Sequence, residues 1–80
     1  ARLQGSLAIQ PARELIDPLT EREEEIVALV AAGASNKAAA GKLFVSENTI
    51  KFHLKNIYSK LGASSRIQAV QIAREMHLIE

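Results

Sequence analysis

Apolar residues recur at helical spacing in four separate stretches of the chain after residue 19. In the longest stretch they recur at i, i+4, i+7, i+8 and i+11, which predicts a helix with one buried stripe formed by Ile50, Leu54, Ile57, Tyr58 and Leu61. Alternating runs break off after a few residues, so strands are not expected. The pattern therefore predicts an all-α fold, a bundle of four short helices.

Capping signals set the expected boundaries of these helices. Serine or threonine stands at each expected N-cap: Thr20, Ser35, Ser46 and Ser65. Glu23 and Gln68 stand three residues after the first and last of these caps, which predicts two capping boxes. Gly33 and Gly62 fit the residues that end the first and third helices.

The other three helices each carry an apolar face. The expected core residues are Ile26, Leu29 and Val30 with Val27 at the edge, then Ala39, Ala40 and Leu43, and finally Ala69, Ile72, Ala73 and Met76. Ile67 and Val70 lie on another side of the fourth helix, so that helix is expected to have a second packing partner. The very short connection Phe44–Val45 favours a steep crossing, as in a helix-turn-helix.

Residues 1–18 differ from the rest because they contain both prolines and show no sustained period. We interpret them as a linker, with one helical turn at Ala12–Ile16, in front of a single domain at residues 19–80. Because the chain does not begin with methionine, we expect it to be part of a longer protein.

Composition narrows the class of protein. There is no cysteine, so neither disulfides nor thiolate metal sites are expected. No apolar run approaches the roughly 20 residues that span a bilayer, and the N-terminus lacks the layout of a secretion signal. We therefore expect no membrane partner and a cytoplasmic location.

Charge is unevenly distributed along the chain. Residues 1–35 hold three basic and six acidic residues, whereas residues 36–66 hold six basic residues and one acidic residue. Such an asymmetry is typical of a domain with a polyanionic partner, although a solvated basic face gives the same count.

The outward side of the third helix, residues 46–61, carries an aromatic residue among lysines. An α-helix fits the DNA major groove, and its first turns reach the base edges. Lysine can contact guanine, asparagine can pair with adenine, and an apolar side chain can contact the thymine methyl group. We therefore predict base contacts from Asn48, Lys51, Phe52 and Lys55. The alternative is that Phe52 packs against a partner protein.

Two helix starts place polar or basic groups beside free backbone N–H groups, where phosphates bind. The residues concerned are Asn36, Lys37, Ser65 and Arg66. Such contacts orient a protein on DNA and are compatible with ordinary capping. His53 lies at the flank of the third helix, where it reaches a phosphate or seals the helix packing; the sequence leaves both open.

Two other classes of function compete with DNA binding. An enzyme is not expected, because His53 and His77 fall on different helices, no glycine-rich loop is present, and capping explains the glutamates at 21–25. No metal site and no cofactor are expected either. The remaining rival is a helical protein-interaction module that uses Phe52 and the apolar faces of the fourth helix.

The segments "LTEREEEIVALVAAGASNKAA" and "LFVSENTIKFHLKNIYSKLGASSRIQAV" together resemble the LuxR-type, or GerE-type, helix-turn-helix domain of bacterial transcription regulators. The resemblance runs from Leu19 to about Leu78. It implies binding to double-stranded DNA as a homodimer, and RNA polymerase as a further partner of the whole regulator. The parent protein looks most like the large MalT-like ATP-binding regulators, then NarL-type response regulators, then quorum-sensing receptors.

The resemblance also assigns residues. Lys51, Phe52 and Lys55 match positions that enter the major groove, and Thr49 matches a position near phosphate, as do the helix-start residues named above. The dimerising surface of several members matches one face of the fourth helix: Ile67, Val70, Gln71 and Arg74.

Helix two departs from the family pattern. Ala38–Gly41 stands where the family usually has larger or charged residues, and Ala39 replaces a large core aliphatic. Gly41 in a helix interior costs about 1 kcal/mol relative to alanine. The sequence therefore predicts a weakly stabilised second helix within an otherwise typical fold.

Overall fold

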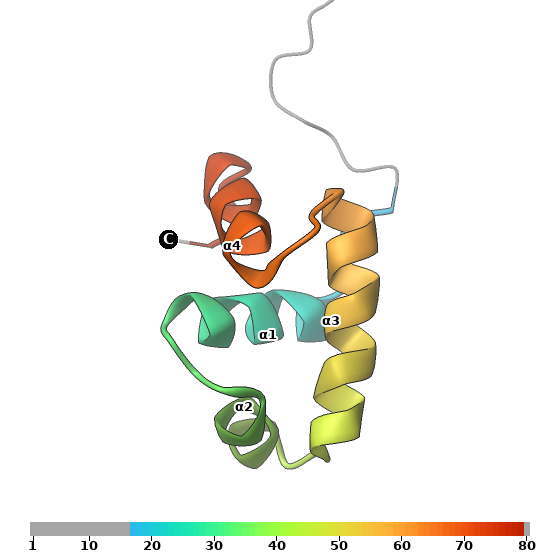
Figure 1. Cartoon of the computed structure of the whole chain (residues 1–80), viewed down its shortest axis with the longest axis vertical. Coiled ribbons are helices and arrows are strands. Elements are labelled where there is room, and N and C mark those ends of the chain that lie inside the picture. The colour runs from blue at the N-terminus through green and yellow to red at the C-terminus, as the bar shows by residue number, and fades with distance from the viewer. Residues whose placement is uncertain (1–16, 80) are drawn as a thin grey trace, which may run out of the picture.

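The computed structural model describes residues 17–79, which form four helices: α1 (Glu21–Ala31), α2 (Asn36–Leu43), α3 (Glu47–Leu61) and α4 (Arg66–Glu75). These residues contain no strand, so the predicted all-α fold is confirmed. Helix α3 packs against all three others, and α1 runs across between α2 and α4 (Figure 1). In this view α2 is seen nearly end-on and α3 from the side, so the two helices cross steeply.

All four predicted N-caps are confirmed. Each cap oxygen accepts a hydrogen bond from the backbone N–H three residues on, at 3.0–3.1 Å. The first capping box is closed by Glu23, whose Oε1 accepts from the Thr20 N–H at 2.9 Å. The second box was wrongly predicted, because Gln68 Oε1 accepts from the N–H and the hydroxyl of Ser64 instead, at 2.6 and 2.9 Å. Ser64 offers two donors to this oxygen, whereas the cap residue's backbone offers one.

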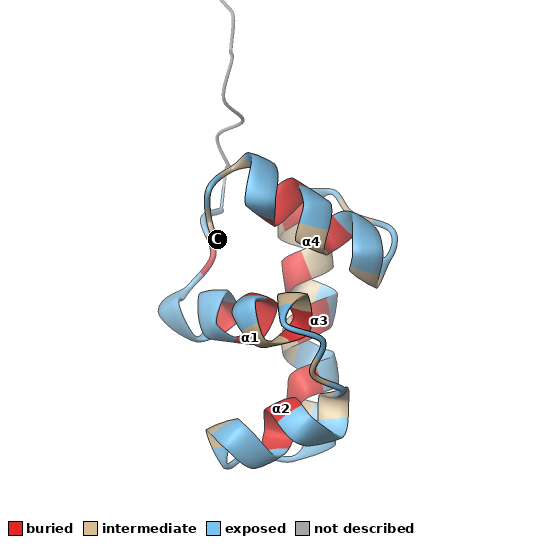
Figure 2. Ribbon diagram, turned by 90° about the vertical axis from the view of Figure 1, so that its left-hand side faces the viewer, coloured by how far each residue is buried: buried red, intermediate tan, exposed pale blue. Residues whose placement is uncertain are grey.

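The core follows the predicted stripes with small shifts (Figure 2). Ile26, Ile50 and Ile57 are the largest fully buried side chains. Val27, expected at the edge of the α1 face, is buried, whereas Leu29 is only half-buried. The buried side of α1 is broader than one stripe because α2, α3 and α4 all pack against it. Some expected core residues are half-buried: Leu43, Tyr58 and Met76.

Helix α2 and its C-cap contain three residues that depart from the usual pattern of a helix. Ala39 is completely buried, so its small side chain lets α2 approach its neighbours closely. Gly41 is exposed and a Cβ there would meet no atom within 4 Å, so its helix-weakening effect is not offset by packing. Phe44 caps α2 in the left-handed region, at φ 59°, and is 94% exposed.

A partly buried ion pair joins the start of α1 to the end of α3. Lys60 Nζ lies 2.7 Å from Glu23 Oε1, and it also donates to the Pro18 carbonyl oxygen at 3.3 Å. Burial raises the pKa of the Glu23 carboxyl, but hydrogen bonds from Lys60 and Thr20 outweigh it, so this pKa lies below its ordinary value. Lys60 therefore belongs to the packing between helices rather than to an open basic surface.

The expected helical turn at Ala12–Ile16 falls outside the described residues. The boundary between linker and domain after residue 18 stays a prediction. Leu19 is nevertheless buried with the core, which ties the chain to the bundle from that point on.

Candidate nucleic-acid interface

The outer face of α3 carries four exposed side chains opposite the buried stripe. They are the residues predicted to contact bases: Asn48, Lys51, Phe52 and Lys55. Their spacing of three and four residues places them on one side of a helix, while Ile50, Leu54 and Ile57 on the other side are buried. Phe52 is 63% exposed, so no residue in the described part of the chain covers it.

The flank of this face includes a histidine. The His53 and Phe52 rings meet edge-to-face, with centroids 5.9 Å apart at 65°. His53 is half-buried, as expected for a residue between core and outer face. The structure thus fits both of the roles left open for it, and the phosphate contact stays a prediction.

The first turn of α3 is ordered by hydroxyl groups. Ser46 caps the helix, and its Oγ lies 2.9 Å from Thr49 Oγ1. Thr49 is half-buried at the edge of the exposed face. Its hydroxyl is therefore held at the helix start, where the free N–H groups favour an anion.

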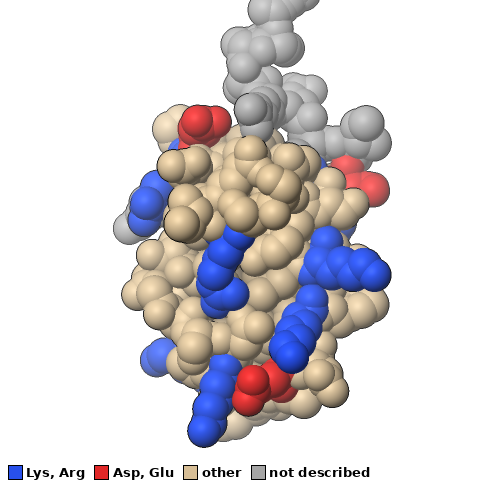
Figure 3. All heavy atoms as spheres, in the orientation of Figure 1, with Lys and Arg blue, Asp and Glu red and all other residues tan. Residues whose placement is uncertain are grey.

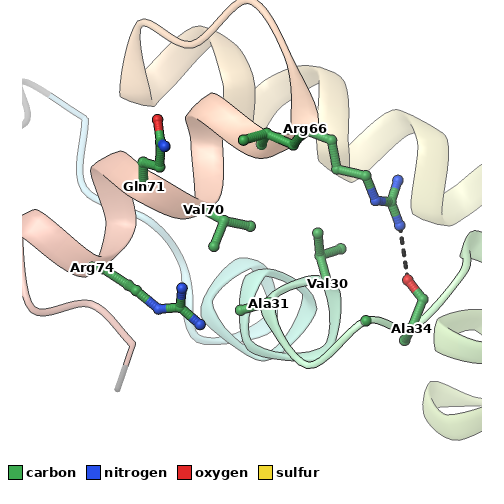
Figure 4. A pocket seen from close by; sticks show the side chains of 9 residues that line it. Val30, Ala31, Ala34, Arg66, Val70, Gln71 and Arg74 are labelled. Carbon is green, nitrogen blue, oxygen red and sulfur yellow. Dashed lines mark hydrogen bonds between the residues drawn. The ribbon is translucent and has the colours of Figure 1, made fainter.

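Arg66 brings the starts of α2 and α4 together. Its Nη1 donates to Asn36 Oδ1 at 3.0 Å. Its Nη2 donates to the Ala34 carbonyl oxygen at 2.9 Å, the bond drawn in Figure 4. Two residues predicted separately as phosphate contacts are thus neighbours in space. Lys37 lines a hollow beside them together with Arg66 and Glu47, whereas Ser65 is an exposed cap.

The structure adds one residue that the sequence did not single out for function. Tyr58, expected in the core, is half-buried and lines a hollow with Asn36, Lys51, Lys55 and Arg66. Helical spacing alone could not place Tyr58 in this hollow, because α2 and α4 supply Asn36 and Arg66 to its lining.

The residues matched to a dimerising surface also lie together. A hollow of about 430 Å³ lies between α1 and α4 (Figure 4). It is lined by Arg66, Ile67, Val70, Gln71 and Arg74 from α4, and by Val30, Ala31, Gly33 and Ala34 from the end of α1 and the turn after it. Ile67 is 73% exposed and Val70 half-buried. Helix α4 thus has an apolar side that its own fold leaves uncovered.

Residues 17–79 were also searched for metal-ligand clusters and for membrane-spanning helices. They contain no group of three or more histidine, cysteine, aspartate or glutamate side chains placed to hold a metal ion. None of the helices in this part of the chain has the length and apolar character that a membrane span requires.

On the face shown in Figure 3, basic side chains spread over the middle and lower part, and acidic ones lie mainly at the upper edges.

The sequence was also compared with known families. The family described as "Bacterial regulatory proteins, luxR family" matches residues 17–78, which is most of the chain. This chain is a member of the luxR family. The family resemblance is thereby confirmed, and with it membership of a DNA-binding, transcription-regulating class with a helix-turn-helix fold.

Solved structures similar to this luxR-family domain include larger regulators. The response regulator ChrA of a heme-sensing two-component system is 44% identical, with a TM-score of 0.75, and the match covers 88% of this chain and 33% of ChrA. The transcription factor GerE is 35% identical, with a TM-score of 0.74 and 78% and 92% covered. Vibrio cholerae VqmA, solved as a complex with ligand and DNA, is 26% identical, with a TM-score of 0.71 and 84% and 30% covered.

The chain therefore spans about a third of ChrA and of VqmA, and nearly all of GerE. These likenesses include a response regulator, which was the second of the three parent types considered. The order of MalT-like, NarL-type and quorum-sensing parents stays a prediction.

Proposed function

We propose that this domain binds double-stranded DNA sequence-specifically as the output domain of a bacterial transcription regulator, with α3 in the major groove. The observation that carries the proposal is the outer face of α3. Its lysines, amide and aromatic ring are exposed on a helix whose other side packs into the core through Ile50, Leu54 and Ile57, so the face is held in a fixed orientation. Membership of the luxR family supports the same function.

The four side chains divide the task by chemistry. Lys51 and Lys55 contact guanine or phosphate oxygens, Asn48 pairs with adenine, and Phe52 meets a thymine methyl group. Phosphates on either side are held by the flanking residues Asn36, Lys37, Thr49, His53, Ser65 and Arg66. An exposed phenylalanine is then explained, because DNA rather than water covers it.

Lys55→Ala is expected to weaken binding to a short duplex about tenfold while the melting temperature stays unchanged. Lys55 is exposed and has no ion-pair partner among the described residues, so its loss removes a DNA contact and no fold contact. Arg22→Ala is the matched control. It removes the same charge at the start of α1, where Arg22 only forms an exposed pair with Glu25 at 3.5 Å. Fluorescence anisotropy at low salt measures both.

Equal weakening of DNA binding by both variants would mean that only net charge matters, and would contradict the placement of α3 in the major groove.

The salt dependence of binding distinguishes DNA binding from the rival protein-interaction module. Contacts to several phosphates weaken steeply with salt, whereas an apolar contact at Phe52 does not.

We further propose that the domain dimerises through α4. The uncovered apolar side at Ile67 and Val70 supports this, and so does the matching family surface. Ile67→Asp should abolish self-association in sedimentation equilibrium at high protein concentration, because it buries a charge in the interface. Since Ile67 is 73% exposed, the variant should keep its helical circular-dichroism signal. If Ile67→Asp self-associates as strongly as wild type, the proposal that α4 forms the dimer interface is wrong.

The whole regulator is proposed to act in the cytoplasm, where its DNA lies. Contact with RNA polymerase and the effector of the parent protein stay predictions. Activity as an enzyme is not proposed, because the luxR family is a family of regulators.

A further inference from the structure

A shallow hollow of about 310 Å³ is lined by residues of α2, α3 and α4. Its lining residues are Asn36, Lys51, Leu54, Lys55, Tyr58 and Arg66. Three of the six are cations and none is an acid, so no lining carboxylate offsets their positive potential. Glu47 lines the neighbouring hollow beside Arg66 instead.

Helix geometry explains why α3 supplies four of the six lining residues. Lys51, Lys55 and Tyr58 stand at i, i+4 and i+7, so they line one flank of the helix. Leu54, which is 5% exposed, contributes an apolar floor next to them. The two lysines therefore border both the outer face of α3 and the hollow.

Arg66 supplies a fixed cation at the opposite wall. A guanidinium has five N–H donors, and the bonds to Asn36 and Ala34 use one donor of each terminal nitrogen. Three donors remain for an anion. Because two hydrogen bonds already hold the group, an incoming anion does not have to order it.

Tyr58 completes the lining with a phenol. Among the described residues its hydroxyl has no hydrogen-bond partner, and the same holds for the ammonium groups of Lys51 and Lys55. The hollow thus combines a phenol, two free ammonium groups and a held guanidinium. An anion with several oxygens satisfies such a set best.

We infer that this hollow seats one backbone phosphate of the bound DNA, with Tyr58 and Arg66 as contacts to it. The inference rests on the proposed function and deepens it. A DNA strand is favoured over a free anion because Lys51 and Lys55 are shared with the outer face of α3. A strand that follows this face brings its backbone to the hollow. The contact sets the depth and angle of α3 and adds affinity without sequence preference.

Tyr58→Phe tests the inference because it removes one hydroxyl and keeps the ring. Binding to duplexes of different sequence should weaken about three- to tenfold, by the same factor for each, with an unchanged melting temperature. Ser59→Ala is the control. It removes a neighbouring exposed hydroxyl that does not line the hollow, and it should change affinity less than twofold.

Lys55→Ala in the same series separates the possible failures. If Lys55→Ala weakens binding and Tyr58→Phe does not, the phosphate seat is overturned while the proposed function stands. If the wild-type chain binds no duplex, the proposed function fails and the inference with it.

Inorganic phosphate provides a second arm, followed by the backbone amide chemical shifts of residues 55, 58 and 66, which can be observed in both wild type and Tyr58→Phe. Stronger binding of duplex than of inorganic phosphate, with both weakened by Tyr58→Phe, supports a seat for a DNA phosphate. Sensitivity to Tyr58→Phe with inorganic phosphate alone would make the hollow a free-anion site and overturn the assignment to DNA.

Discussion

Ile57→Ala is expected to lower the free energy of unfolding by about 2–5 kcal/mol. Ile57 is completely buried on α3, the helix against which all the others pack, so truncation leaves a cavity at the centre of the bundle. A domain of this size has a total stability of about 3–9 kcal/mol, so the variant loses a large part of it. Urea denaturation followed by circular dichroism measures the effect.

Ile67→Ala is the matched control for this truncation. The same atoms are removed from a side chain that is 73% exposed, so the free energy of unfolding should change by less than about 0.5 kcal/mol at concentrations where the chain is monomeric. Similar losses in both variants would contradict the described core and the placement of α3.

Glu23→Ala is expected to cost about 2–4 kcal/mol at neutral pH. The substitution opens the capping box at the start of α1 and leaves the ammonium group of Lys60, which is 22% exposed, without its carboxylate. Glu23→Gln should cost less, because its amide oxygen still accepts the hydrogen bond from the Thr20 N–H. The difference between Glu23→Ala and Glu23→Gln measures the contribution of the capping hydrogen bond. The difference between Glu23→Gln and wild type measures the contribution of the charge.

The same pair predicts a pH dependence with a definite sign. Because the pKa of Glu23 is lowered in the folded chain, the unfolded chain binds the proton more readily below the ordinary value of 4.5. The stabilisation is therefore fully present above about pH 4.5 and is lost as the pH falls through the folded-state pKa. The free energies of unfolding of wild type and Glu23→Gln should therefore become equal at acid pH. Urea denaturation at a series of pH values measures both. A constant difference across the series would mean that the Glu23 charge contributes nothing.

Local signals in the sequence predicted most of the fold. Caps and apolar periodicity depend on neighbours within four residues, so Thr20 and the stripe of α3 could be located without a structure. The second capping box failed even at this range, because Ser64 competes for the same amide oxygen of Gln68. Family membership then confirmed the class of domain that these signals indicated.

The same local signals could not predict which side chains make contact between helices. Lys60 was counted with the basic middle of the chain, yet it pairs with Glu23, 37 residues away. Arg66 reaches Asn36 across 30 residues, and Tyr58 joins a hollow that three helices form. Such partners depend on how helices cross, which charge counts and periodicity do not encode. The exposed residues of α3 could be predicted because helical spacing alone decides their side.

The most direct test of the central claim, that α3 reads DNA, is an amide chemical-shift titration of the labelled chain with a short random duplex. It is run first at low salt and then at moderate salt. The account predicts shifts concentrated at residues 36–37, 48–55 and 65–66, which fade as salt rises. Absence of shifts at low salt, or shifts confined to the outer side of α4, would contradict DNA binding through α3 and leave Phe52 as the contact for a protein partner.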